Sequence, residues 1–80
     1  MKKVVVYTTH YCGYCTAAKR FLNTKNIDFE EIDVTRDDAM REKLVEMCGG
    51  METVPQIFVD GKSMGGYDEL VKFYESGNKI

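Results

Sequence analysis

Two cysteines near the start of the chain, in the sequence Cys12-Gly13-Tyr14-Cys15, are the residues best suited to chemistry. A short apolar run precedes them and residues at helical spacing follow, so the pair lies where a strand is expected to give way to a helix. The free amides and partial positive charge of a helix start favour a thiolate over a thiol, which makes Cys12 the expected reactive sulfur. Cys15 lies one helical turn further, and this brings the two Cα atoms within the ~4.4–6.8 Å that a disulfide tolerates. The spacing therefore predicts a redox-active disulfide between Cys12 and Cys15.

A metal site is the alternative use of such a pair. The chain has three cysteines, an odd number, and the spacing within the motif is too tight to join distant parts of a secreted fold. In a reducing compartment a C-x-x-C pair is usually catalytic or metal-binding. The sequence offers no second C-x-x-C, and only His10 and Cys48 remain as soft ligands for zinc. We therefore expect redox chemistry and no zinc site, with Cys48 a small buried apolar residue.

Length and composition limit the classes of protein to which the chain can belong. Of its 80 residues 44% are hydrophobic and 30% are charged, and we expect residues 1–80 to form one small globular domain. The net charge of -2 argues against a nucleic-acid partner. The apolar run from Val4 to Tyr7 has four residues, fewer than the ~7–15 of a signal peptide. We expect a cytoplasmic monomer with no membrane partner.

The hydrophobic pattern predicts an α/β fold in the order β-α-β-α-β-β-α. The β-α-β start implies parallel pairing of the first two strands, and Asp60-Gly61 is typical of the tight turn in a hairpin between the last two. In the first helix an apolar stripe that includes Cys15 is expected to face inward, with Lys19 on the opposite side. The expected architecture is a four-stranded mixed sheet with helices on both faces. Its strands are expected at residues 4–7, 29–34, 56–59 and 62–64. Its first helix is expected at about 13–25 and its last at about 67–75. The second helix has start signals at 35–38 and is expected to end at about 48.

Several short motifs together resemble those of the glutaredoxins, a family of the thioredoxin-fold superfamily. They agree in order and spacing over nearly the whole chain, and they are Thr8, Cys12-Gly13-Tyr14-Cys15, Thr53-Val54-Pro55-Gln56-Ile57-Phe58, Asp60-Gly61 and Gly65-Gly66-Tyr67-Asp68. The resemblance implies a thioredoxin fold and a glutathione-dependent oxidoreductase that reduces protein-glutathione mixed disulfides and protein disulfides. It also implies a set of residues that contact glutathione as co-substrate, namely Tyr14, Thr53, Val54, Pro55, Gly66, Tyr67 and Asp68.

The residues themselves suggest how such a ligand would be held. If the Val54-Pro55 bond is cis, the Val54 amide and carbonyl face outward and an extended peptide could pair with them as an added strand. Otherwise Pro55 simply begins a strand. The glycines at 65 and 66 let a ligand approach the backbone, and the following helix start offers amides to a carboxylate. Asp68 would then bind the ammonium of a γ-glutamyl end, or act only as a helix-terminal residue, and Tyr14 could pack over the ligand or over the core.

Two positions depart from the glutaredoxin pattern. Thr9 stands where a lysine is common, so a cation for the glycyl carboxylate of glutathione must come from elsewhere, and Arg41 is the candidate. Gly13 stands where many dithiol members have proline, which keeps open a 2Fe-2S cluster ligated by Cys12 of two protomers and two glutathiones. A redoxin that depends on thioredoxin reductase is a further alternative, although Asp68 and the double glycine at 65 and 66 argue against it. His10 could stabilise the Cys12 thiolate when protonated, but a loop histidine is more often only solvated.

Overall fold

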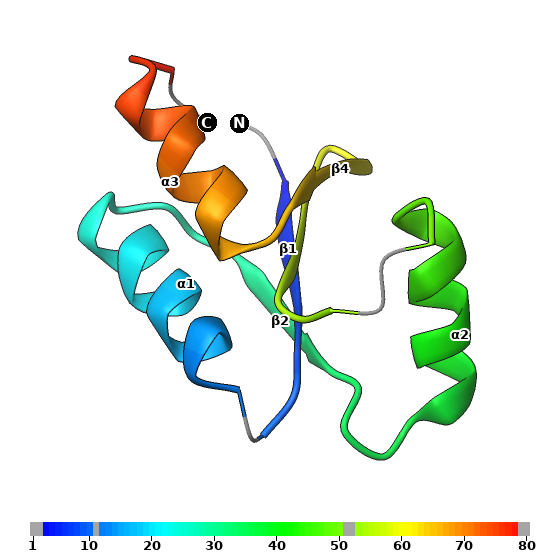
Figure 1. The fold of residues 1–80 in the computed structure, drawn as a ribbon. Coiled ribbons are helices and arrows are strands. Elements are labelled where there is room, and N and C mark those ends of the chain that lie inside the picture. Colours follow the sequence, from blue (N-terminus) through cyan, green and yellow to red (C-terminus); the bar gives the residue numbers. More distant parts are fainter. Residues whose placement is uncertain (1–2, 11, 51–52, 79–80) are drawn as a thin grey trace.

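The fold is a sheet with helices on both of its sides, seen in a computed structural model that describes residues 3–10, 12–50 and 53–78 (Figure 1). The element order is β-α-β-α-β-β-α, as the pattern predicts. The strands are β1 (Val4–Thr8), β2 (Glu30–Asp33), β3 (Gln56–Val59) and β4 (Lys62–Gly65). The helices are α1 (Gly13–Thr24), α2 (Asp38–Met47) and α3 (Tyr67–Glu75).

The sheet is mixed, with strand order β2-β1-β3-β4. β1 pairs in parallel with β2 and antiparallel with β3, which in turn pairs antiparallel with β4. The expected hairpin turn is present, because Asp60 and Gly61 have φ angles of 52° and 82°, and a tight hairpin turn of this kind requires positive φ at both central residues. β4 runs one residue further than predicted, to Gly65, because a register shift opposite Ile57 and Phe58 inserts an extra residue in the ladder.

One face of the sheet and the inner sides of α1 and α3 enclose the main core. Figure 1 shows these two helices together on one side of the sheet, with α2 on the other. The residues of β1 alternate between buried and half-buried, as a strand covered more fully on one face should. Each large aliphatic side chain removed from water here contributes about 1.5–3 kcal/mol. The core cluster comprises Val4, Val6, Ala18, Leu22, Ile57 and Leu70.

The second face of the sheet is covered by α2 and carries a smaller apolar layer. Leu44 is the buried residue of α2. On the sheet, the rings of Tyr7 and Phe58 meet edge to face, with centroids 5.4 Å apart. Asp37 caps α2 by accepting a hydrogen bond of 3.0 Å from the Met40 amide, so the helix-start signal in the sequence is confirmed.

The expectation that Lys19 lies on the solvent side of α1 is wrong. Its Nζ is 2.9 Å from Glu31 Oε2 on β2, and its side chain is only 31% exposed. The same carboxylate oxygen accepts a hydrogen bond of 2.7 Å from the hydroxyl of buried Thr8. Lys19 follows Cys15 by four residues and so lies at the edge of the inward stripe. A lysine can occupy that position because its aliphatic stem covers apolar surface while its ammonium reaches a carboxylate.

Candidate active site

Cys12 lies at the start of α1, as the sequence predicts, and its sulfur is held by backbone groups. It is the N-cap residue, and its Sγ accepts a hydrogen bond of 3.0 Å from the Cys15 amide. The thiol is also 3.5 Å from the carbonyl oxygen of Val54, a residue far away in the sequence. The sulfur therefore faces an amide at the start of the helix, where the backbone carries partial positive charge.

Cys15 is sealed inside the protein, with 1% of its surface exposed. Burial and, to a smaller extent, the hydrogen bond with Cys12 raise the pKa of its thiol to about 12. Its thiol is therefore protonated at neutral pH. Both cysteines are free, so the structure is that of the dithiol form. A half-buried sulfur at a helix start beside a protected one suits stepwise thiol-disulfide exchange, in which the first attacks and the second resolves.

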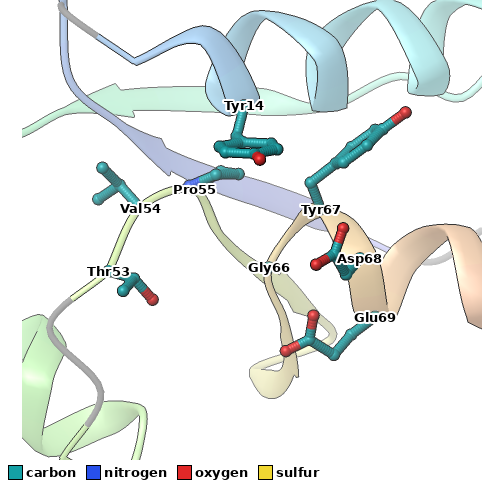
Figure 2. A pocket seen from close by; sticks show the side chains of 8 residues that line it. All are labelled: Tyr14, Thr53, Val54, Pro55, Gly66, Tyr67, Asp68 and Glu69. Atoms are coloured by element: carbon teal, nitrogen blue, oxygen red, sulfur yellow. The ribbon is translucent and has the colours of Figure 1, made fainter.

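An open cavity of about 290 Å³ lies near Cys12 (Figure 2). Neither cysteine is among its lining residues, and Val54, which lines it, connects the cavity to the sulfur of Cys12. Its walls come from the start of α1, the segment before β3 and the start of α3, three parts of the chain that only the fold brings together. The cavity is close to the lower end of the ~300–1,000 Å³ that is usual for small-ligand clefts. All seven residues that the sequence assigned to glutathione line it, and Glu69 is added, so the lining is Tyr14, Thr53, Val54, Pro55, Gly66, Tyr67, Asp68 and Glu69.

The segment before β3 is fixed by local contacts. The Val54-Pro55 bond is cis, which is the condition that the sequence left open. Gln56 is fully buried, and its Nε2 donates to the Thr53 carbonyl at 2.8 Å and to the Thr53 hydroxyl at 3.2 Å. Across the cavity, a Cβ on Gly66 would lie 3.3 Å from the Pro55 carbonyl oxygen. A glycine at 66 therefore allows α3 to begin close to this segment.

Two tyrosines form an aromatic wall on the α1 and α3 side of the cavity. Tyr14 is 65% exposed, and its ring centroid is 6.2 Å from that of Tyr67 at an interplanar angle of 37°. Figure 2 shows both rings above the segment that contains Pro55. Of the two roles that the sequence left open for Tyr14, this exposure favours contact with a ligand over covering the core. Its ring instead supplies apolar surface at the rim of the cavity.

The opposite end of the cavity is acidic. Asp68 and Glu69 lie in the first turn of α3, and Figure 2 shows both carboxyl groups beside Gly66. Sequence interpretation missed Glu69, although its place directly after Asp68 at a helix start was the available signal. Among the described residues that line this cavity there is no lysine or arginine. The acidic pair therefore favours a cationic group on a ligand, beside helix amides that favour an anionic one.

Arg41, the candidate cation for the position left by Thr9, lies on the far side of the Thr53-Val54 segment. It lines a second cavity of about 270 Å³ against α2, which shares Thr53 and Val54 with the first. Arg41 thus approaches the same backbone from the α2 side rather than from within the first cavity. Its role in binding stays a prediction.

His10 and Cys48 have structural partners outside the first cavity. His10 Nε2 is 2.6 Å from Asp33 Oδ2, and the His10 amide donates to the Thr35 hydroxyl at 2.8 Å. Hydrogen bonds from Thr35, with a smaller contribution from His10, lower the pKa of Asp33. Cys48 was expected to be buried, but it is half-buried, because it caps the end of α2. This partial burial raises the pKa of its thiol, and a hydrogen bond with Ser63 acts in the opposite direction. Within the described ranges, no three His, Cys, Asp or Glu side chains gather as a metal site.

Comparison with known proteins finds relatives over nearly the whole chain. A family model described as Glutaredoxin matches residues 4–64. Glutaredoxin 1 of Rickettsia prowazekii is 40% identical over 75 residues, which cover 92% of this chain and 79% of that protein. Glutaredoxin 3 of Escherichia coli K12 is 40% identical over 70 residues, which cover 88% of this chain and 83% of that protein.

Solved structures agree with the sequence relatives. Glutaredoxin 1 from Francisella tularensis, complexed with cacodylate, has a TM-score of 0.79 at 35% identity, with 95% of each chain covered. A buckwheat glutaredoxin-glutathione complex has a TM-score of 0.87 at 29% identity, with 95% of this chain and 71% of that chain covered. The expected thioredoxin fold is therefore confirmed, together with its mixed four-stranded sheet.

Proposed function

Because this chain belongs to the glutaredoxin family, we propose that it is an oxidoreductase that uses glutathione and acts through Cys12 and Cys15. The observation that carries the proposal is the cavity beside Cys12, whose lining includes every residue that the sequence assigned to glutathione. Val54 joins the two, since it lines the cavity and its carbonyl oxygen is 3.5 Å from Cys12 Sγ. The proposed substrates are protein-glutathione mixed disulfides and protein disulfides.

The proposed ligand is an extended tripeptide whose groups match the walls of the cavity. Its backbone pairs with Val54 as an added strand, which brings its sulfur beside Cys12. Its α-carboxylate binds at the amides of the α3 start, and its ammonium binds Asp68 and Glu69. The ring of Tyr14 packs over the bound tripeptide. The buckwheat relative supports this ligand, since its structure is a glutaredoxin-glutathione complex.

In the proposed reaction with a glutathionylated protein, Cys12 alone is sufficient. The Cys12 thiolate attacks the glutathione sulfur, the bond to the client sulfur breaks, and the client leaves as a thiolate that takes up a proton. A second glutathione thiolate then attacks the mixed disulfide. Oxidised glutathione leaves and the Cys12 thiolate is restored. The glutathione taken from the client and the second glutathione leave together as the disulfide, so one glutathione thiol is consumed for each client thiol released.

With a protein disulfide, the proposed reaction needs both cysteines. Cys12 attacks one client sulfur and forms a mixed disulfide, and Cys15 then attacks Cys12 Sγ. The Cys12–Cys15 bond forms as the bond to the client breaks, so the client leaves reduced and the dithiol is oxidised. Glutathione reduces the new disulfide in a later step.

The test is turnover of a glutathione mixed disulfide with glutathione as reductant. Cys12→Ser should lose this activity, whereas Cys15→Ser should keep much of it, because the resolving thiol is not used. Cys48→Ser serves as a matched control, because it also removes one thiol but lies at the end of α2. Equal losses in the Cys12 and Cys15 variants would contradict the scheme.

The two other functions considered from the sequence are separable with the same protein. Iron-sulfur binding, suggested by Gly13, predicts a coloured dimer after anaerobic reconstitution with iron, sulfide and glutathione. A redoxin that depends on thioredoxin reductase predicts reduction by that enzyme and indifference to glutathione. A glutathione-ligated cluster would use the same cavity as the proposed reaction, so colour after reconstitution separates the two, whereas a redoxin that ignores glutathione has no use for that cavity.

We further propose a monomer that works in the cytoplasm. A C-x-x-C pair that glutathione reduces suits a compartment that maintains a reduced thiol pool. None of the helices in the described part of the chain is long and apolar enough to cross a membrane.

A further inference from the structure

A lysine lies on the inward side of α1, one turn beyond the buried thiol. Residues four apart on a helix share a face, so Lys19 lies next to Cys15 along that face. The other members of the same stripe, Ala18 and Leu22, are fully buried, and the Lys19 side chain is only 31% exposed. A cation at the edge of a core stripe needs a reason, because each charge taken from water has a desolvation cost.

The ammonium of Lys19 is paired with a carboxylate on β2 that a residue of β1 also binds. Its Nζ is 2.9 Å from Glu31 Oε2 on β2, and the same oxygen accepts a 2.7 Å hydrogen bond from the buried hydroxyl of Thr8 on β1. These hydrogen bonds, first from Thr8 and then from Lys19, lower the pKa of Glu31, which therefore stays charged. This ion pair directs the partly exposed Lys19 side chain toward β2.

Cys15 is the group near Lys19 whose chemistry requires a positive charge. Burial is the main cause of its raised pKa, and the positive charge of Lys19 acts in the opposite direction, together with a backbone hydrogen bond from Thr9. To resolve a mixed disulfide, Cys15 must lose its proton inside the protein. A fixed cation one turn away lowers the free energy of the resulting anion.

We propose that Lys19 is a positioning residue for the resolving step, in which its tethered ammonium stabilises the thiolate that forms on Cys15. The proposal rests on the dithiol part of the proposed function. Cys15 releases its proton to water, its thiolate attacks Cys12 Sγ, and the Cys12–Cys15 bond forms as the bond to the client sulfur breaks. The client leaves as a thiolate and is reprotonated. The reaction that uses Cys12 alone does not depend on Lys19.

The test follows the two steps separately with an aromatic disulfide that releases one coloured thiolate when Cys12 attacks and a second when Cys15 closes the bond. Stopped-flow absorbance then gives two phases, and no glutathione is present, so the result does not depend on which reductant the protein uses. All variants carry Cys48→Ser, which removes the third thiol. The neutral variants are Lys19→Gln, which keeps a donor for Glu31, and Lys19→Met. Arg20→Met is the matched control, because it removes an exposed cation from the neighbouring position of the same helix.

We expect both neutral variants to slow the second phase about two- to fivefold, the range for a part-exposed charge that solvent and a partner screen. The pH at which this phase reaches half its maximum should rise, since the loss of the cation disfavours the thiolate. The other charged or titratable groups around this site are Cys12, Glu31, Asp33 and, through Asp33, His10, and all of them are retained. Lys19→Arg should restore the second phase.

The first phase should be unchanged in every variant. A second phase that keeps its rate in Lys19→Gln would overturn the proposal. So would an equal slowing in Arg20→Met, or a parallel slowing of both phases, since each would indicate a general structural effect rather than a charge that acts on Cys15.

Discussion

Gln56→Met should weaken glutathione binding without unfolding the protein, although Gln56 lines no part of the cavity. Gln56 is fully buried, and its Nε2 makes both hydrogen bonds that hold Thr53. Its Oε1 is buried and has no hydrogen-bond partner among the described residues. Methionine is similar in length and flexible enough to fill the same space, so this change removes the donor and the unpaired oxygen together.

The two effects on stability oppose each other. Two lost hydrogen bonds cost about 1–3 kcal/mol in total, and removal of a buried unpaired oxygen returns about 1–3 kcal/mol. We therefore expect the free energy of unfolding, measured with urea, to change by less than about 1.5 kcal/mol. The orientation of Thr53 and Val54 has no such compensation. If glutathione must order this segment on binding, its binding free energy weakens by about 1 kcal/mol, and the KM for glutathione rises about fivefold.

The assay is steady-state reduction of a glutathione mixed disulfide at varied glutathione, with urea unfolding on the same samples. Thr53→Val is the matched control, because it removes only the hydroxyl acceptor and keeps the 2.8 Å bond to the carbonyl, so its effect on KM should be smaller. A Gln56→Met protein that is stably folded and has an unchanged KM would refute the idea that Gln56 orients this segment. A loss of stability above about 3 kcal/mol would refute the compensation argument.

Three further outcomes are expected. Tyr14→Ala should raise the KM for glutathione while it changes the free energy of unfolding by less than about 0.5 kcal/mol, because the side chain is 65% exposed. A decrease in the free energy of unfolding as large as the loss in binding free energy would show instead that the ring packs on the core. Leu22→Ala, at a fully buried position of α1, should cost about 2.7–5 kcal/mol in urea unfolding, and a cost below ~1 kcal/mol would contradict the described core. The pKa of Glu31 is lowered from 4.5, so between the two values the unfolded chain binds more protons than the folded one and stability falls as the pH drops through this range. Glu31→Gln should therefore lose less stability than the parent in thermal unfolding between about pH 5 and pH 3, and identical acid profiles would contradict the Thr8–Glu31–Lys19 contacts.

Most of the element order was predictable from the sequence, because its signals are local. The apolar strand β1, the helix start at Asp37 and the Asp60-Gly61 turn depend on neighbours within a few residues, and all agree with the structure. Element ends shifted by a residue or two where pairing decided them. β4 gained Gly65 through the register shift against β3, which no local pattern records.

The candidate site was predicted unevenly. The seven cavity residues came from a resemblance between motifs, and the fold brings them to one cavity. Glu69 was missed because an acidic residue directly after Asp68 is equally typical of an ordinary helix start. Lys19 was placed on the wrong side because a charged residue at the edge of an apolar stripe looks solvated until its partner is known. That partner, Glu31, is on another strand.

The sequence by itself determined in which order the helices and strands occur, since residue type, periodicity and turn residues act over short range, and it predicted which residues carry chemistry. Only the tertiary structure decided which distant groups meet. Sheet pairing brings the carbonyl of Val54 to the sulfur of Cys12, 42 positions away. It also sets Thr8 and Glu31 side by side under Lys19. These contacts depend on strand register and helix placement, which are set by the packing of the whole core and not by any one segment.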